Sequence, residues 1–196
     1  MFMFPFLAIF VIFCIVLSFY IRKNDSEQQR VQDEFWEKER KSNAVRKKDI
    51  SKLDYITIPL DKIPVKLETS AEETLIALSQ EPMLNLTGIS NTDLKLEYGT
   101  ANLEALSAYD ANFTEFVATL PEYTLQLQEA GYVDAAQALL EFAVSVKADS
   151  RKIYKQLADI YIENQQTDKL SWLEESAKEL PLFTQNAILK DLSAIN

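Results

Sequence analysis

Residues 151–163, RKIYKQLADIYIE, belong to a stretch in which apolar positions recur at a regular interval. Tyr154 lies midway along the sequence between two apolar counterparts, Leu120 and Ile188. The same interval relates further pairs: Tyr123 to Leu157, Leu127 to Tyr161, Tyr161 to Ile195, Ala136 to Leu170 and Ala143 to Ala177. Such an interval, of about 34 residues, is typical of stacked helix pairs, in which neighbouring repeats bury a continuous core. We therefore expect two helix pairs over residues 118–196, closed by a final helix at 183–194.

Two blocks within this stretch carry a resemblance to a known family. The block Tyr154-x2-Leu157-Ala158-x2-Tyr161 resembles the tetratricopeptide (TPR) signature Trp-x2-Leu-Gly-x2-Tyr. The block Ala136-x3-Leu140-x2-Ala143 resembles the pattern of the second TPR helix. Pro121 inside a first helix and Glu174 at an apolar position depart from the family pattern. The resemblance implies an all-α, antiparallel helical array; the alternative is a generic helical bundle with accidental spacing.

A second resemblance extends over the whole chain and rests on three segments. They are Phe35-Trp36-Glu37, residues 54–60 (DYITIPL) and residues 86–99 (LTGISNTDLKLEYG). Through them the chain resembles a group of membrane-anchored, TPR-like proteins from anaerobic Gram-positive bacteria. This resemblance implies no activity.

Residues 2–21 carry no charge and match the roughly 20 apolar residues that a membrane-spanning helix needs. A cleavable signal peptide is the alternative, but the segment lacks a basic start and a small-residue cleavage site. The flanking Lys and Arg residues all follow the span, beginning with Arg22 and Lys23. By the positive-inside rule we expect an uncleaved, single-pass anchor of the cell membrane at 1–22, with the rest of the chain in the cytoplasm.

Three segments follow the anchor. Residues 23–52 interleave both charge signs without Pro or Gly, which favours a charged juxtamembrane stalk helix. Residues 53–68 contain Pro59 and Pro64 among β-branched residues, which predicts an extended strap laid over the helical domain. Residues 69–196 form the predicted TPR-like domain.

Helix boundaries inside this domain are predicted from end signals. Ser70-Ala-Glu-Glu73 is a capping box that opens a short helix. A second helix is expected from Asn91 or Thr92 to a C-cap at Gly99. Asn102 is expected to cap a long helix, whose predicted apolar face comprises Leu103, Leu106, Tyr109, Phe113, Phe116, Val117 and Leu120.

Composition argues against an enzyme, a cofactor or metal, and nucleic acid. The 196 residues include no His and one cysteine, Cys14, which removes the commonest general base and any site built from several cysteines. The net charge of -10 opposes binding to a polyanion. Asp93, Glu97 and Asp110 can form a polar pocket if residues 84–101 fold over the long helix, although local capping explains them more simply.

The TPR resemblance implies that the first helix of each pair lines a concave groove. Ala118 and Pro121 fall on this face, together with the expected partner-groove residues Leu125, Gln128, Lys152, Lys155, Asp159, Ile162, Asn186 and Leu189. Two lysines in an otherwise acidic domain favour an internal acidic peptide with an apolar anchor. The alternative is that both lysines balance nearby acids such as Asp149.

Two functions remain open. The first is a membrane-anchored protein–protein interaction scaffold that binds a protein or peptide through this groove. The second is a structural accessory subunit that packs against a larger membrane complex through its anchor helix and Phe35-Trp36.

Overall fold

The structure, a computed structural model, describes residues 3–62 and 67–194. These residues form helices and no strand, so the all-α prediction is confirmed. The chain divides into two compact units: unit 1 is Met1–Lys48 with Ser90–Ala101, and unit 2 is Asp49–Ile89 with Asn102–Asn196. Residues 90–101, expected within the domain 69–196, therefore pack with the N-terminal helix instead.

Helix α1 (Met3–Asn43) runs without interruption across the expected border between anchor and stalk. Its 41 residues correspond to about 60 Å. From Leu7 onward it contains neither Pro nor Gly. In its charged half, Arg30 pairs with Glu34 at 2.9 Å and Lys41 with Glu37 at 2.8 Å, both at i, i+4 spacing. Local sequence thus favours this helix along its length.

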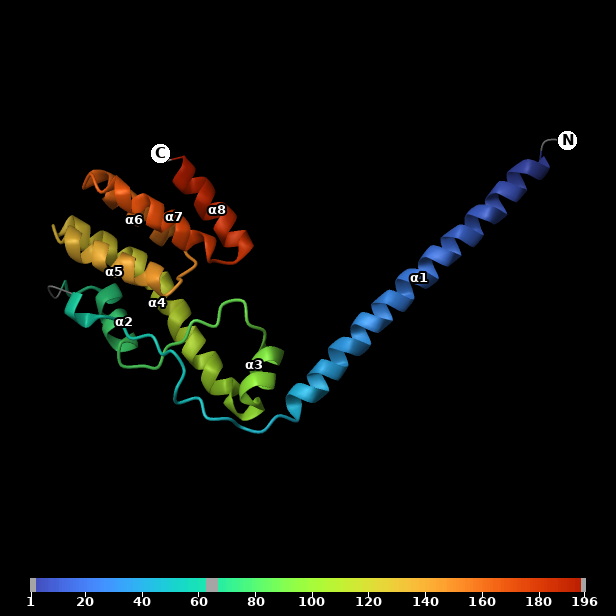
Figure 1. The fold of residues 1–196 in the computed structure, drawn as a ribbon, viewed down its shortest axis with the longest axis horizontal. Helices are drawn as coiled ribbons and strands as arrows, with labels where there is room; N and C mark the ends of the chain where they lie inside the picture. Colours follow the sequence, from blue (N-terminus) through green and yellow to red (C-terminus); the bar gives the residue numbers. More distant parts are fainter. Residues whose placement is uncertain (1–2, 63–66, 195–196) are drawn as a thin grey trace. The chain divides into compact units, whose positions relative to one another are not determined.

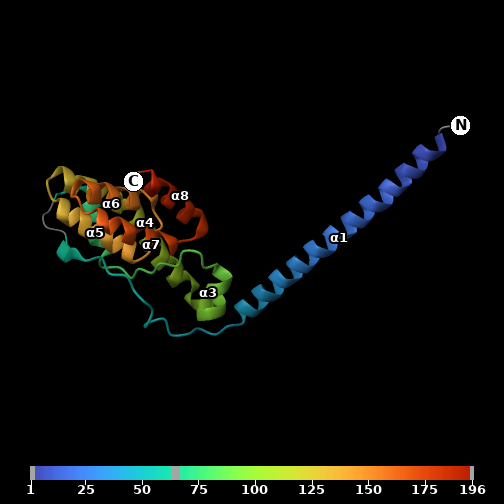
Figure 2. The same cartoon turned by 45° about the horizontal axis from the view of Figure 1, so that its top comes forward.

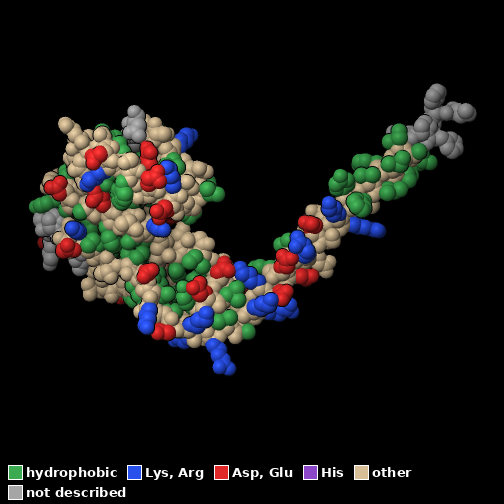
Figure 3. All heavy atoms as spheres, viewed as in Figure 1, with side chains coloured by type: hydrophobic (Ala, Val, Ile, Leu, Met, Phe, Trp, Pro, Cys, Tyr) green, Lys and Arg blue, Asp and Glu red, His purple; other side chains and the backbone are tan. Residues whose placement is uncertain are grey.

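The first half of α1 is long and apolar enough to cross a membrane. An 18-residue window within Leu7–Asn43 reaches a mean hydropathy of 1.8, and none of it is buried by the rest of the chain. Figure 3 shows apolar side chains covering this half, with basic and acidic side chains interleaved farther along the helix. The long apolar N-terminal helix is therefore confirmed; Phe2, where the predicted span begins, lies outside the described residues.

Helix α1 ends at Asn43, so the prediction of a stalk helix to residue 52 is wrong for its last residues. The reason is the segment around helix α3 (Asn91–Tyr98), which lies beside the end of α1 (Figures 1 and 2). The backbone N–H of Lys48 donates to the Tyr98 carbonyl at 3.0 Å. Gly99 approaches so closely that a Cβ on it would lie 2.4 Å from the Arg46 carbonyl oxygen. These tertiary contacts engage backbone groups that a longer α1 would need for its own hydrogen bonds.

Side chains fasten α3 to α1. The Lys95 ammonium lies 2.6 Å from the Glu39 carboxylate, and both side chains are largely buried. Lys38 pairs with Asp93 at 2.6 Å on the exposed side. Ser90 caps α3 by accepting the N–H of Asp93, so the helix begins at Asn91 as predicted.

Unit 2 is an array in which consecutive helices pack on one another (Figure 1). Helix α4 packs against α5, α5 against α6, and α6 against α7 and α8, while α2 packs against α4. The helices are α2 (Ser70–Leu78), α4 (Leu103–Glu129), α5 (Val133–Ser145), α6 (Arg151–Glu163), α7 (Leu170–Lys178) and α8 (Leu182–Ser193). Short 3-10 turns occupy Leu60–Lys62, Thr100–Asn102 and Thr167–Lys169.

The positions that recur at the regular interval lie in the core of this array. Leu120, Tyr154 and Ile188 are at most 1% exposed. The remaining related residues that the structure describes are also buried: Tyr123, Leu127, Ala136, Ala143, Leu157, Tyr161, Leu170 and Ala177. Ile195 lies outside the described residues. The first residues of α5 and α7, Val133 and Leu170, are farther apart in the sequence than the regular interval that relates Leu120 to Tyr154. The helix starts therefore do not keep this interval. The TPR arrangement stays a prediction.

Two predicted caps are wrong in detail. Helix α2 is capped by Thr69, whose hydroxyl accepts the N–H of Glu72, while Ser70 is its first helical residue. The Glu72 carboxylate, in place of that of Glu73, accepts a backbone N–H before the helix, that of Glu68, at 2.8 Å. Asn102 precedes α4, but its side chain makes no cap hydrogen bond because a 3-10 turn already leads into the helix.

Most of the predicted apolar face of α4 is buried. Leu106, Phe113, Phe116 and Leu120 are in the core, whereas the other three predicted residues are half-buried: Leu103, Tyr109 and Val117. The face continues past Pro121, because α4 extends to Glu129 and also buries Tyr123 and Leu127.

The expected strap, residues 53–68, forms no strand among its described residues. Ile58 is buried, and the N–H of Ile56 donates to the Met83 carbonyl at 2.9 Å. The Tyr55 ring packs edge-on against Tyr109, with centroids 5.7 Å apart. Leu60–Lys62 form a 3-10 turn, and residues 63–66 lie outside the described part.

Candidate functional site

Three helices of unit 2 meet at a hollow of about 590 Å³, which we name the α4/α6/α8 hollow. One side is α4, and the other sides are the starts of α6 and α8 with the end of the α5–α6 connection. It is lined by Thr114, Val117, Ala118, Pro121, Asp149, Ser150, Arg151, Lys152, Phe183, Thr184 and Ala187. The hollow is an open depression of the surface, not an enclosed cavity.

The α4 side of the hollow is apolar and contains a proline. Pro121 follows Val117 by four positions and Ala118 by three, so these residues share one face of the helix. Pro121 is buried inside a 27-residue helix and has no N–H to give to the carbonyl of Val117. Neighbouring side chains support the helix there: the Gln156 amide donates to the Pro121 carbonyl at 2.9 Å, and the Thr124 hydroxyl donates to the Leu120 carbonyl at 3.0 Å.

The α6 and α8 side is rich in positive charge. Arg151 donates two hydrogen bonds of 2.8 Å to the Asp191 carboxylate. These bonds hold the pKa of Asp191 below its usual value, and the charges of Lys155 and Lys190 act in the same direction. Arg151, which lines the hollow, and Lys155 and Lys190, which do not, thus all act on this acid.

Lys152 and Asp149 line the hollow with opposite charges. Lys152 is exposed and makes no ion pair within the part of the chain that the structure describes. Neither α6 nor α8 has an acidic residue in its first turn or a side-chain cap at its N-terminus. Asp149, immediately before the N-cap Ser150, offsets part of the positive end of the α6 dipole, whereas no acidic side chain in the first turn offsets that of α8.

Phe183 and Leu182 are the most exposed large apolar side chains described in unit 2. Phe183 is 90% exposed and Leu182 is 75% exposed, whereas no other described large apolar residue of this unit exceeds 49%. Exposed aromatic residues at the edge of a hollow are typical of protein-binding surfaces.

Of the eight expected groove residues, Lys152 alone is among those that line the hollow. Lys155, Asp159 and Asn186 are exposed elsewhere, as are Leu125 and Ile162. Gln128 is half-buried and donates to the Thr124 carbonyl at 3.2 Å, while Leu189 packs against the core. Ala118 and Pro121, which fall on the expected concave face, do line the hollow.

Sequence reasoning missed the residues that α8 contributes, above all Phe183. The final helix was expected to close the array and to add only Asn186 and Leu189 to the groove, and a phenylalanine close to a proline gives no signal of exposure. Asp149 and Ser150 were missed because they precede α6, outside any helical pattern. The cluster of Arg151, Lys152 and Lys155 without an intervening acid is the signal that points to this region.

A second hollow, of about 530 Å³, lies between α5 and α7 beside Phe142 and Trp172. Its polar side is Glu141, which accepts hydrogen bonds from Lys169 at 3.0 Å and Tyr161 at 2.9 Å. Burial opposes ionisation, but these donors and Gln137 hold the pKa of Glu141 below its usual value. Through these hydrogen bonds, Glu141 connects α5 to α6 and to the 3-10 turn before α7. Because the carboxylate already has these donors, we assign the network a structural role.

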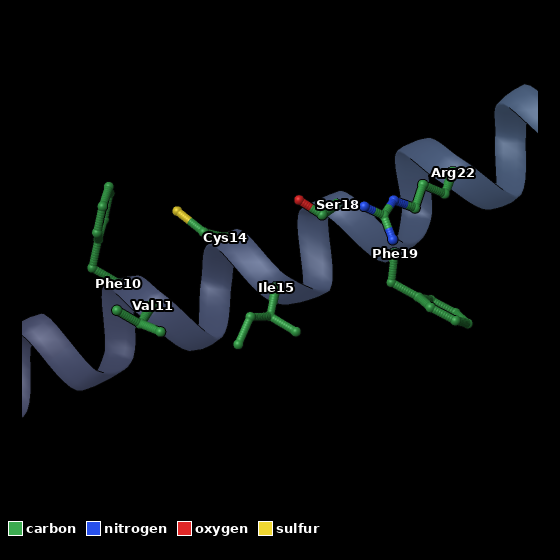
Figure 4. Close-up of a pocket in the computed structure, with 7 residues that line it drawn as sticks. All are labelled: Phe10, Val11, Cys14, Ile15, Ser18, Phe19 and Arg22. Carbon is green, nitrogen blue, oxygen red and sulfur yellow. The ribbon is translucent and has the colours of Figure 1, made fainter.

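A third surface runs along the membrane-compatible half of α1 (Figure 4). Phe10, Cys14 and Ser18 project from one side of the helix, and Ile15 and Phe19 from the other. This is the surface of a single helix, and its small residues at i, i+4 spacing are not in themselves a site.

The acidic residues expected to form a polar pocket have separate partners. Asp93 binds Lys38 and Ser90, whereas Asp110 accepts the N–H of Leu86 at 3.0 Å. Among the described residues, no group of three His, Cys, Asp or Glu side chains could hold a metal ion. The predictions of no enzyme activity and no cofactor stay predictions.

Comparison with protein families, curated proteins and solved structures gives no match to this chain. The α4/α6/α8 hollow must therefore be interpreted from its own residues.

Proposed function

We propose that this protein is a membrane-anchored protein–protein interaction scaffold whose helical array faces the cytoplasm and binds a partner at the α4/α6/α8 hollow. The observation that carries the proposal is the coincidence of a 590 Å³ hollow with Phe183 at 90% exposure. A concave surface with an unburied aromatic residue has the chemistry of a protein-binding site.

The TPR-like reading of the array is part of this proposal. It is supported by the burial of residues related by the regular interval, such as Ala143 and Ala177, both with no exposed surface. Small residues at these positions let neighbouring helices approach closely. In a TPR-like array α4, α6 and α8 are the groove-lining helices, which are the three that meet at the hollow.

Anchoring is supported by the apolar half of α1, and orientation by the cations that follow it. A cysteine placed at the exposed Glu175 tests the orientation, because the sole native cysteine, Cys14, lies within the predicted span. In intact cells a membrane-impermeant thiol reagent should leave Glu175→Cys unlabelled and label it after permeabilisation. Labelling in intact cells would reverse the orientation.

The alternative, a structural accessory subunit, is favoured by a different observation. Val31, Phe35 and Trp36 lie on α1 beyond the predicted span, yet each is more than half exposed. The rings of Phe35 and Trp36 pack against each other, with centroids 5.3 Å apart, and leave their outer surfaces free. A larger complex can cover this surface together with the anchor.

Site-specific photo-crosslinking in cells separates the two functions. A crosslinking amino acid replaces Thr114 in the hollow, Trp36 on α1, or the exposed Glu175 on α7 as a control. Protein adducts from Thr114 that are absent from Glu175 support the scaffold. Adducts from Trp36 alone support the accessory subunit and refute the scaffold.

A further inference from the structure

We propose that the partner segment received by the α4/α6/α8 hollow is an acidic stretch in which a large apolar side chain lies next to carboxylates. This inference rests on the proposed function and specifies its ligand. Three features of the hollow carry it: an apolar wall, an unpaired cation at a cationic edge, and a proline in the wall of α4.

The apolar side chain is the part that the hollow can bury. Val117, Ala118 and Pro121 form one wall, and Ala187 contributes from α8. Phe183 stands at the edge with 90% of its surface in water. An inserted apolar group removes surface on both partners from water, which is the main driving force for such contacts.

The carboxylates are selected by charge. Residues 53–196 carry ten basic and 23 acidic side chains, so most of this region repels an acidic partner. Four of the ten basic residues are concentrated in nine positions: Lys147, Arg151, Lys152 and Lys155. Lys147 is paired with Glu179 at 3.0 Å and Arg151 with Asp191, which leaves Lys152 as the unpaired cation that lines the hollow.

Asp149 is the acidic residue among those lining the hollow, and Asp191 is the second acid at this edge. Arg151 and Lys152 are the cations among the lining residues, and Lys155 and Lys190 lie outside the lining but act on Asp191. The N-terminus of α8, which has no acidic residue in its first turn, adds to the same positive potential. The edge is therefore positive within an acidic domain, which orients an acidic segment toward it.

Pro121 gives the hollow its third feature. Because proline lacks an N–H, the Val117 carbonyl loses the i+4 hydrogen bond that it would receive elsewhere in α4. Val117 and Pro121 both line the hollow, so this interruption of the helix lies in its wall. A residue that breaks a local rule inside a regular element is expected where function requires it.

A membrane surface is the competing ligand class, since exposed Phe183 and nearby lysines also suit anionic lipid. A concave wall favours a protein segment, because an inserted side chain fills it and a bilayer surface does not. The net negative charge of the array also opposes anionic lipid.

The test uses the full chain in nanodiscs of neutral phosphatidylcholine. A phage library of random dodecapeptides is selected on the native chain and counter-selected on the Phe183→Ser, Lys152→Glu double variant. We expect the enriched peptides to carry Leu, Ile, Phe or Trp within two positions of at least two Asp or Glu residues. No enrichment over the double variant, or enrichment of basic or uncharged peptides, would overturn the inference.

The affinities of the most enriched peptide for single variants then show which of the three features contribute to binding. Lys152→Glu and Phe183→Ser should each weaken binding at least tenfold. The matched controls Lys178→Glu and Trp172→Ser, on the exposed surface of α7, should change it less than twofold. Equal effects of site and control variants would contradict the assignment.

Pro121→Ala separates binding from folding. Restoring the N–H improves α4 as a helix, so the melting temperature should stay the same or rise. Peptide affinity should nevertheless fall at least threefold, because the proline ring is lost from the apolar wall. Unchanged affinity would remove Pro121 from the site.

Two outcomes distinguish this inference from the proposed function. If Thr114 crosslinks a protein in cells and Lys152→Glu leaves that adduct intact, the scaffold stands and the acidic ligand is refuted. The second outcome is that the native chain binds vesicles of phosphatidylserine and phosphatidylcholine in equal parts, that Lys152→Glu does not bind them, and that no peptide is enriched. The hollow is then a lipid site, and both proposals fail.

Discussion

Helices α1 and α6 have the same backbone but are stabilised in different ways. Of the 13 residues of α6, six are buried against neighbouring helices: Ile153, Tyr154, Leu157, Ala158, Ile160 and Tyr161. In α1 the apolar residues from Leu7 to Ile21 are exposed, and burial is confined to its other end, at Ser42. Helix α6 therefore depends on tertiary packing, whereas α1 depends on its own sequence and on a bilayer or partner outside the chain.

The largest expected effect tests the dependence of α6 on packing. Leu157→Ala removes a fully buried side chain and should lower the free energy of unfolding by about 2–5 kcal/mol. Thermal unfolding of the full chain in detergent, followed by far-UV circular dichroism, measures it. Ile162→Ala, on the exposed side of the same helix, is the control and should change it by less than about 0.5 kcal/mol.

A second substitution tests close packing rather than lost contacts. Ala158 has no exposed surface, so Ala158→Leu must push neighbouring helices apart. Overpacking of this kind costs about 1–3 kcal/mol. The same melt reports it, and an unchanged melting temperature would argue against close helix approach and against the TPR-like reading.

Unit 1 offers a test of the contact that ends α1. Gly99 and Gly88 both have positive φ, near +87° and +83°, but a Cβ on Gly99 would strike the Arg46 carbonyl, whereas one on Gly88 meets nothing within 4 Å. Gly99→Ala also carries backbone strain, because φ 87° with ψ 149° is a region essentially confined to glycine. Hydrogen exchange of the α3 amides should therefore increase more in Gly99→Ala. Equal exchange in the two variants would mean that the close approach does not hold α3 in place.

The two units should also respond to opposite ends of the pH scale. Hydrogen bonds from Lys95 and Lys38 lower the pKa of Glu39 and of Asp93, respectively. A carboxyl group whose pKa is lower in the folded than in the unfolded protein stabilises the fold at pH values above its unfolded-state pKa, which is about 4. This stabilisation is lost as the pH falls through the folded-state pKa. Protection of the α3 amides should thus decrease below about pH 4, and Glu39→Gln should flatten this loss.

The array should instead weaken in alkali. Burial, with a smaller contribution from Glu72, raises the pKa of Tyr123 to about 12. Burial likewise raises the pKa of Tyr154 and of Tyr161. A raised folded-state pKa contributes stability below the unfolded value, about 10, that is lost as pH rises toward the folded values. Tyrosinate absorbance of these residues should appear together with loss of ellipticity; its appearance in a fully folded array would contradict their burial.

The smallest effect is expected on the charged half of α1. Arg30 and Glu34 form an exposed i, i+4 pair, and such pairs contribute about 0.2–0.5 kcal/mol. Glu34→Gln should leave both the melting temperature and the α3 exchange within error. A large shift would show that this part of α1 is packed against something outside the chain.

The sequence by itself determined the features that arise from short-range patterns. The apolar, uncharged run before Arg22 predicted the long N-terminal helix, because about 20 consecutive apolar residues are typical of a helix that crosses a membrane. The regular interval between apolar positions identified some of the buried residues of α4 to α8, among them Leu120, Tyr154 and Ile188, because large apolar side chains pack between neighbouring helices. The start of α3 at Asn91 and its C-cap at Gly99 lie where local end signals predicted them.

Tertiary structure alone decided what depends on contacts between distant residues. Helix α1 ends at Asn43 because backbone around Arg46 and Lys48 is engaged by Tyr98 and Gly99, which lie far along the sequence. The hollow likewise requires Pro121, Lys152 and Phe183 to meet from three separate helices. Periodicity identifies which face of each helix is buried. It does not show how far neighbouring helices are shifted along their axes, which decides which helix ends meet. The site therefore lies where α6 and α8 begin, and most of the residues predicted along the middle of the groove lie outside it.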